Sequence, residues 1–383
     1  MNINDKKIKS PCFIIDKEVL DINISIIKES FKKNKNNLII GYSVKTNSSQ
    51  YLINYFNTMG IYSEVVSEDE YNYVKRLGIS LNKIIYNGPI KSKETLIEAV
   101  SNGSIVNIDS FRELMWLIKS NIYNKEIGIR VNLPITDDLK LHFEYPKDGS
   151  RFGFDINDEK LNMFINSLLN EKNIKIVGLH FHINTNNRDP IVYSKMIEYS
   201  QRAIKKFNLK LKYIDIGGGY FGGNKEIFET YIKEIKRTLL KHPNLNNVNL
   251  IIEPGAALVA TAISYYTKVI DTKIINDKKI ITVDGSRVHI DPTFSDKKYK
   301  YYVKNNKINK NYKTIICGFS CMERDRFKLD KNLDLSTGDY IIFKNLGAYT
   351  MTFIPNFIFG KPRVYVKENN KLRLISKKRS LER

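Results

Sequence analysis

Short apolar, β-branched runs alternate with longer amphipathic segments from residue 38 to residue 253. Helix-length segments among the latter include 50–59, 93–100, 158–169, 192–207 and 226–240. The runs predict strands at 38–44, 63–66, 83–86, 105–108, 127–131, 174–181, 211–216 and 248–252. Strands that alternate with helices form parallel sheets, and eight units in about 220 residues fit a closed (β/α)8 TIM barrel. A doubly wound open sheet is the alternative, because the third and fourth runs are short.

The helical period stops after about residue 262. Residues 265–290, 299–317 and 339–367 are rich in strand-forming residues, and turn-forming residues such as Asp284-Gly285 punctuate them. We therefore expect an α/β chain with two domains. The barrel takes residues 24–262, and an antiparallel β domain, sandwich-like or barrel-like, takes residues 1–23 and 263–383, with an N-terminal strand at 11–15 joining it.

Composition places the chain among ordinary soluble globular proteins. It has 383 residues, 42% of them hydrophobic, and a formal net charge of +21. Three cysteines, Cys12, Cys317 and Cys321, exclude a disulfide framework. No apolar run approaches the ~18 residues of a membrane helix, and the first residues are polar and basic, so the expected compartment is the cytoplasm.

The positive charge raises the question of nucleic acid. The densest basic stretch, 297–313, interleaves Lys with Tyr, a pattern that single-stranded nucleic acids can use. Lysines elsewhere are spread along the whole chain, however, and no nucleic-acid motif accompanies them. We therefore interpret the charge as a solvated basic surface and expect neither nucleic acid nor membrane as a partner.

The active site of such a barrel lies at the carboxyl ends of its strands. The predicted strands place Lys45, Arg130 and the pair His180 and His182 there, together with Gly217-Gly218-Gly219 and Glu253. A desolvated lysine suits Schiff-base chemistry, and a glycine turn exposes N–H groups to a phosphate. With a carboxylate for the pyridine nitrogen, this set indicates pyridoxal 5'-phosphate and no metal.

Motifs in the expected order support this interpretation over nearly the whole chain. They are "YSVKTN", "SEVVSEDEY", "IYNGPIKS", "GIRVN", "SRFGF", "GLHFHINT", "DIGGGY", "EPGAALV", "TVDGS", "CGFSCMERD" and "GAYT". The sequence resembles the fold-type III pyridoxal-phosphate enzymes, the ornithine/diaminopimelate/arginine decarboxylase family that shares its barrel with alanine racemase.

The resemblance implies a role for each matching position. Lys45 would carry the covalent link to the cofactor, His182 would stack on its ring, and Glu253 would hold the pyridine nitrogen. Cys321 would reach the site from a second copy of the chain and return a proton, which implies a homodimer. The other positions expected at the cofactor are Glu64, Arg130, Thr185, Gly217, Gly218, Gly219, Gly255 and Tyr349.

Departures from the family pattern concern the substrate. Ala256 stands where the family commonly has arginine, Asp291 where diaminopimelate decarboxylases have a basic residue, and Met322 where an acid follows the cysteine. We expect Asp291, Glu323 and Tyr349 to contact the substrate. Two carboxylates facing each other disfavour diaminopimelate. The pattern resembles the branch of siderophore metabolism, whose substrates are conjugated amino acids such as a citryl-diaminopropionate.

The sequence thus predicts a decarboxylase that removes the α-carboxylate of a basic or diamino acid, or of a conjugate of one. An amino-acid racemase of the same fold is the alternative, although the Cys321 segment argues against it. A regulator without catalysis is a second alternative, disfavoured because Lys45, His182, Glu253 and Cys321 are all present.

Overall fold

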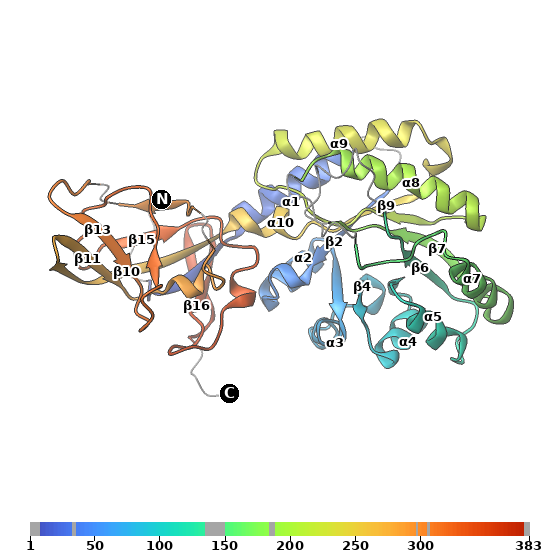
Figure 1. The fold of residues 1–383 in the computed structure, drawn as a ribbon, viewed down its shortest axis with the longest axis horizontal. Helices are drawn as coiled ribbons and strands as arrows, with labels where there is room; N and C mark the ends of the chain where they lie inside the picture. Colours follow the sequence, from blue (N-terminus) through green and yellow to red (C-terminus); the bar gives the residue numbers. More distant parts are fainter. Residues whose placement is uncertain are drawn as a thin grey trace. The chain divides into compact units, whose positions relative to one another are not determined.

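The computed structural model describes residues 8–32, 36–134, 150–183, 188–295, 298–304 and 307–378 (Figure 1). The chain divides into two compact units. One comprises residues 25–257, and the other comprises residues 1–24 together with 258–383.

Eight parallel strands of the first unit close into a barrel in chain order, with the last strand paired to the first. This arrangement confirms the predicted TIM barrel, and the open-sheet alternative is wrong because an open sheet would leave two unpaired edges. The strands are β2 (Leu38–Ser43), β3 (Tyr62–Ser67), β4 (Ile84–Ile90), β5 (Ile105–Ile108), β6 (Glu126–Arg130), β7 (Lys175–His180), β8 (Tyr213–Asp215) and β9 (Asn249–Ile252).

Helices cover the outside of these strands (Figure 1). They are α1 (Lys17–Phe31), α2 (Gln50–Thr58), α3 (Glu68–Arg76), α4 (Lys93–Ser101), α5 (Phe111–Ile118), α7 (Glu159–Lys172), α8 (Ile191–Phe207) and α9 (Lys225–Leu240), and the short α10 (Ala256–Val259) follows the last strand. Ser67, Ser92 and Ser110 cap α3, α4 and α5 by accepting a backbone N–H three residues later. These caps fix where each chain segment leaves its strand end.

The barrel interior is packed with side chains. Ile85, Val177, Tyr213 and Ile251 form a buried cluster contributed by four different strands. Because alternate residues of a strand point inward, this layer supports the strand ends above it.

A sheet of nine strands organises the second unit. They are β1 (Cys12–Asp16), β10 (Ile263–Ile275), β11 (Lys278–Val283), β12 (Tyr301–Val303), β13 (Lys313–Cys317), β14 (Arg326–Phe327), β15 (Tyr340–Phe343), β16 (Arg363–Glu368) and β17 (Lys371–Ser376). Most pairs are antiparallel as predicted, but β1 with β16 and β11 with β13 are parallel, so the sheet is mixed. The N-terminal strand β1 lies between β10 and β16.

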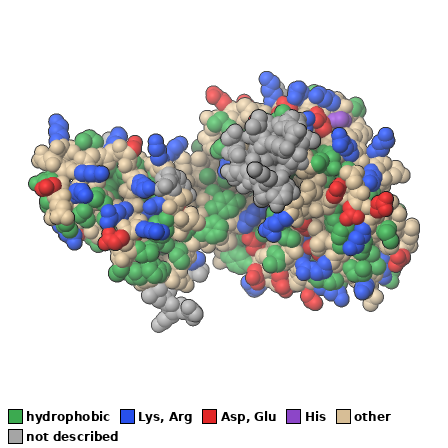
Figure 2. All heavy atoms as spheres, in the orientation of Figure 1, with side chains coloured by type: hydrophobic (Ala, Val, Ile, Leu, Met, Phe, Trp, Pro, Cys, Tyr) green, Lys and Arg blue, Asp and Glu red, His purple; other side chains and the backbone are tan. Residues whose placement is uncertain are grey.

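Lys and Arg side chains are distributed over the visible face, with Asp and Glu among them (Figure 2). Within the described ranges, we find no helix that is both long and apolar enough to cross a lipid bilayer.

Candidate active site

Lys45 follows the first barrel strand. It lies in a single turn of 3-10 helix, Val44–Thr46, and its Nζ is 3.5 Å from Oε2 of Glu64 on the neighbouring β3. The Glu64 side chain is 1% exposed, and Ser43 donates a hydrogen bond to it. Burial, followed by the charge of the nearby Glu253, raises the pKa of Glu64, while the Lys45 ammonium opposes this. The amine is therefore held at the barrel mouth beside the Glu64 carboxyl group.

The glycine turn after β8 has a conformation and surroundings that require glycine. Gly217 and Gly219 have φ of +67° and +97°. A Cβ on Gly217 would lie 2.6 Å from Nδ1 of His182, and one on Gly218 would lie 2.5 Å from the carbonyl oxygen of Glu253. The backbone of the turn thus packs against His182 and Glu253, which are both predicted to contact the cofactor.

His182 is held in one orientation by backbone and side-chain partners. The Gly218 N–H donates to its Nδ1 at 3.1 Å, and Arg130 donates to its carbonyl oxygen at 3.2 Å. Burial, then the positive charge of Lys45, lowers the pKa of His182 to about 3. Its imidazole is accordingly neutral at physiological pH, consistent with Nδ1 accepting the Gly218 N–H.

Arg130 ends β6 and is itself fixed. It donates to Asp109 Oδ2 at 2.9 Å, and the other Asp109 oxygen accepts the Gly153 N–H at 2.7 Å. The guanidinium also lies 4.5 Å from the centroid of the Phe152 ring. Arg130 therefore connects three loops at the carboxyl end of the barrel.

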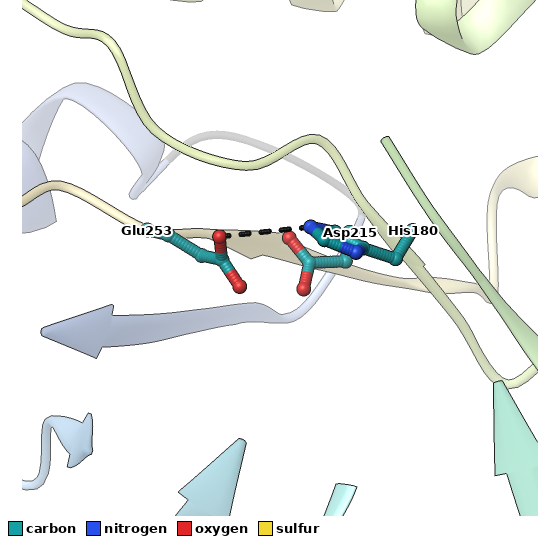
Figure 3. Close-up of side chains that lie close together, drawn as sticks. All are labelled: His180, Asp215 and Glu253. Carbon is teal, nitrogen blue, oxygen red and sulfur yellow. Dashed lines mark ion pairs between the residues drawn. The ribbon is translucent and has the colours of Figure 1, made fainter. Parts of the chain in front are cut away.

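Glu253 lies just after β9 and shares a buried cluster with His180 and Asp215 (Figure 3). His180 Nε2 is 3.7 Å from Glu253 Oε2. Burial, followed by the Glu253 carboxylate, raises the pKa of Asp215 well above its usual value. One ligand atom from each of the three lies within 4.8 Å of the others.

Two asparagines that sequence analysis did not single out lie beside the carboxyl groups of Glu253 and Glu64. Asn87 Nδ2 donates to Glu253 Oε1 at 2.5 Å and to Glu64 Oε1 at 3.2 Å, and Asn107 donates to Asn87. Asn87 lies inside the quoted "IYNGPIKS" and Asp215 begins "DIGGGY", so the motifs contained both without indicating their contacts.

Gly255 packs the end of β9 against the Lys45 turn. A Cβ there would lie 2.0 Å from Thr46 Oγ1 and 3.2 Å from the Ser43 Cβ. Thr185 lies outside the described residues. The barrel strands thus bring together Lys45, Glu64, Arg130, His182, the glycine turn, Glu253 and Gly255.

The remaining predicted site residues belong to the β unit. Cys321 is an exposed free thiol, Glu323 pairs with Arg326, and Tyr349 is 45% exposed with φ of +55°. Asp291 is buried and paired with Arg287 at 2.8 Å. Their contacts with cofactor or substrate stay predictions.

A carboxyl group missed by sequence analysis holds the Cys321 loop. Asp325 is buried and accepts hydrogen bonds from Ser286 Oγ at 2.9 Å, from the Arg287 N–H at 2.7 Å and from the Ser320 N–H at 3.1 Å. It therefore ties the loop that carries Cys321 to the segment after β11.

The barrel residues fit pyridoxal 5'-phosphate. A phosphate site needs an exposed backbone N–H in a turn without Cβ atoms. Gly219 is exposed, in a turn that leaves no room for a Cβ on Gly217 or Gly218. The predicted phosphate contacts of Gly217 and Gly218 are not supported, because their N–H groups donate to Asp215 and His182. Lys45 offers an amine to the cofactor aldehyde, His182 offers a neutral imidazole to the ring, and Glu253 offers a buried carboxylate to the pyridine nitrogen.

Known proteins similar to this chain agree with the fit. Residues 24–260 match the family described as pyridoxal-dependent decarboxylase, pyridoxal binding domain. A diaminopimelate decarboxylase of Aquifex aeolicus is 27% identical over 371 residues, covering 92% of this chain and 86% of that protein. A probable ornithine decarboxylase of Dictyostelium discoideum is 28% identical over 383 residues, covering 91% and 78%.

Solved structures show the same fold. The crystal structure of diaminopimelate decarboxylase from M. jannaschii aligns with a TM-score of 0.84 at 22% identity, covering 98% of this chain and 91% of that one. Because the family match spans well over half of the chain and the barrel carries the matching site, this protein belongs to the pyridoxal-dependent decarboxylases, enzymes that use pyridoxal 5'-phosphate to decarboxylate amino acids.

Proposed function

We propose that the protein removes the α-carboxylate of a basic or diamino acid, or of a conjugate of one, with Lys45 as the lysine that binds the cofactor aldehyde. The observation that carries the proposal is the position of Lys45 Nζ at the barrel mouth, 3.5 Å from buried Glu64, on the same strand ends as His182 and Glu253. When bound, the cofactor supplies a ring that accepts the electrons left by the departing carboxylate.

The chain's own residues would divide the remaining work. Glu253 would hold a proton at the pyridine nitrogen, which keeps the ring electron-poor. Neutral His182 would pack on the ring face without repelling that proton, and the N–H of exposed Gly219 would bind the phosphate. Arg130 would keep His182 in place through its carbonyl oxygen, which it contacts at 3.2 Å.

We also propose that the substrate is larger than a free diamino acid, as in a siderophore-type precursor such as a citryl-diaminopropionate. The support comes from two departures in the sequence: Ala256, in the barrel unit, replaces the family arginine, and Met322, in the β unit, replaces an acid. Asp291 adds no support, because its pairing with Arg287 offsets the expected repulsion of a substrate carboxylate. The test is kcat/KM for ornithine, diaminopimelate and the conjugate. A higher value for the conjugate supports the proposal, and a higher value for free diaminopimelate contradicts it.

The proposal includes a homodimer in which Cys321 of one copy protonates the product carbon in the site of the other. Its support is the exposed thiol in a loop fixed by Asp325. Sedimentation velocity should give a dimer. Mixing the inactive variants Lys45→Ala and Cys321→Ala should restore about a quarter of the activity by forming hybrid dimers with one intact site. If the mixture regains no activity, a site that takes Lys45 from one copy and Cys321 from the other is contradicted.

The role of Lys45 is tested by borohydride reduction of the cofactor-loaded protein, followed by peptide mass spectrometry. We expect the cofactor mass on the peptide that contains Lys45, and none after Lys45→Ala. Lys225→Ala, an exposed lysine of α9 in the same unit, is the control and should be labelled like the wild type. Labelling of another lysine would overturn the assignment.

A further inference from the structure

A chain of hydrogen bonds crosses the inside of the barrel below the site. Tyr213 on β8 donates its hydroxyl to Asn107 Oδ1 on β5 at 2.8 Å, and Asn107 Nδ2 donates to Asn87 Oδ1 on β4 at 2.8 Å. Asn87 Nδ2 then donates to both Glu253 and Glu64. The two asparagines and both carboxylates are at most 2% exposed, so water does not compete with these bonds.

The direction of the chain follows from the chemistry of its ends. A carboxylate only accepts hydrogen bonds, so the Asn87 nitrogen must face Glu253 and Glu64. The Asn87 oxygen then faces Asn107, whose nitrogen donates to it and whose oxygen faces the Tyr213 hydroxyl. Burial raises the pKa of Tyr213 well above its usual value, so this hydroxyl remains a donor. Each amide thus has one satisfied orientation.

The barrel makes room for this tyrosine at two glycines. A Cβ on Gly178 would lie 1.9 Å from the Tyr213 Cζ, and one on Gly128 would lie 2.2 Å from its hydroxyl oxygen. The neighbouring strands β6 and β7 therefore carry no side chain where the ring crosses the interior. An apolar residue would fill the same volume, so packing alone does not account for the hydroxyl, which donates to Asn107.

We propose that Asn87 is a positioning residue that holds the Glu253 carboxylate toward the cofactor's pyridine nitrogen, and that Tyr213 fixes the orientation of Asn87 through Asn107. This inference rests on the proposed role of Glu253. Without the Asn87 amide, Glu253 and Glu64 would lose the donor that they share, and Glu253 would be positioned by its neighbours His180 and Asp215 without that bond.

The test compares two ligands of the cofactor-free protein: pyridoxal phosphate, and its analogue with carbon in place of the pyridine nitrogen. The measured quantity is the ratio of the analogue's dissociation constant to that of pyridoxal phosphate. This ratio isolates the contact between Glu253 and the pyridine nitrogen, because a general loss of stability weakens the binding of both ligands equally. For wild type we expect the analogue to bind more weakly. In Asn87→Leu the ratio should fall about tenfold, the size of one hydrogen bond to a charged group.

Tyr213→Phe removes a single oxygen and should lower the ratio in the same direction, so it carries the test if Asn87→Leu does not fold. Asn36→Leu is the control, because Asn36 is a buried asparagine of the same unit whose side-chain amide donates to the carbonyl oxygens of Leu245 and Val248, away from the site. Its ratio should equal that of wild type.

The outcomes distinguish a failure of the Asn87 role from a failure of the Glu253 role. If wild type prefers pyridoxal phosphate and both site variants keep the full preference, the positioning role of Asn87 is overturned while the role of Glu253 stands. If wild type binds the two ligands equally well, the proposed role of Glu253 fails, and the inference fails with it.

Discussion

Gly218 shows how one missing methyl group shapes the site. Its backbone has no left-handed strain, but a Cβ there would lie 2.5 Å from the carbonyl oxygen of Glu253 and 3.6 Å from His182 Cε1. Gly218→Ala should push apart the glycine turn and Glu253. We expect a cofactor dissociation constant raised roughly tenfold or more, consistent with the ~1–3 kcal/mol of an overpacked site. Equilibrium titration of the apoprotein with cofactor measures it.

Gly103→Ala provides the matched control for this substitution. Gly103 lies in the same unit with φ of +78°, and a Cβ there has nothing within 4 Å. The change should lower thermal stability through backbone strain while leaving cofactor affinity unchanged. Equal affinity of Gly218→Ala and wild type would show that the turn does not form the cofactor site.

Glu70 gives a pH-dependent prediction. It lies on α3, accepts the Val66 N–H at 2.9 Å, and burial raises its pKa from 4.5 to about 7. The folded state therefore binds this proton more tightly than the unfolded state, so the contribution to stability is complete below pH 4.5 and is lost as pH rises through about 7. Glu70→Gln retains the acceptor but cannot ionise.

We expect Glu70→Gln to match wild type at pH 4 and to be more stable at pH 8, by on the order of 2–3 kcal/mol. Thermal unfolding midpoints of both proteins between pH 4 and pH 8 measure the difference. A difference that stays constant over this range would contradict the assigned protonation.

At the scale of elements, the strand-to-helix turns after β4 and β5 are joined by a buried ion pair. Lys91 Nζ donates to Gly88 O at 2.6 Å and to Glu113 Oε2 at 3.1 Å, and both side chains are fully buried. The same Glu113 oxygen accepts the Asp109 N–H at 3.1 Å. Since Asp109 anchors Arg130, the pair supports the site from outside the barrel mouth.

Lys91→Met should destabilise the protein by about 3–5 kcal/mol, because it leaves the Glu113 charge buried without a partner. Replacing both, Lys91→Met with Glu113→Leu, should recover most of the loss, since two apolar groups need no hydrogen bonds. Urea unfolding of the single and double variants measures both values. If the double variant is less stable than Lys91→Met alone, the Glu113 side chain stabilises the turns through more than its pairing with the Lys91 charge.

At the scale of the whole molecule, the barrel was predictable because its signal is local. The apolar runs at 38–44 and 174–181 became β2 and β7 with ends shifted by one residue. Helix α3 was not singled out, since only Tyr71 and Val74 of its residues are buried and most of its other residues are charged or polar. The parallel pairing of β11 with β13 was missed because register between distant segments leaves no periodic trace.

The same limit applies to the site. Strand ends and motifs indicated Lys45, His182 and Glu253, because the barrel rule converts sequence position into location. The bond from Asn87 to Glu253 joins residues 166 positions apart, and that from Tyr213 to Asn107 spans 106. Which polar side chains meet inside the barrel depends on side-chain packing, which neither periodicity nor single motifs encode.

The most direct test of the central claim is proton NMR of the cofactor-loaded enzyme in D2O with a panel of amino acids. The panel contains ornithine, lysine, arginine, diaminopimelate, diaminobutyrate and a citryl-diaminopropionate conjugate. We predict that one substrate loses CO2 and yields an amine carrying one deuterium at the former α-carbon. Exchange of the α-proton for deuterium with the carboxylate retained would instead identify a racemase, and would contradict the account.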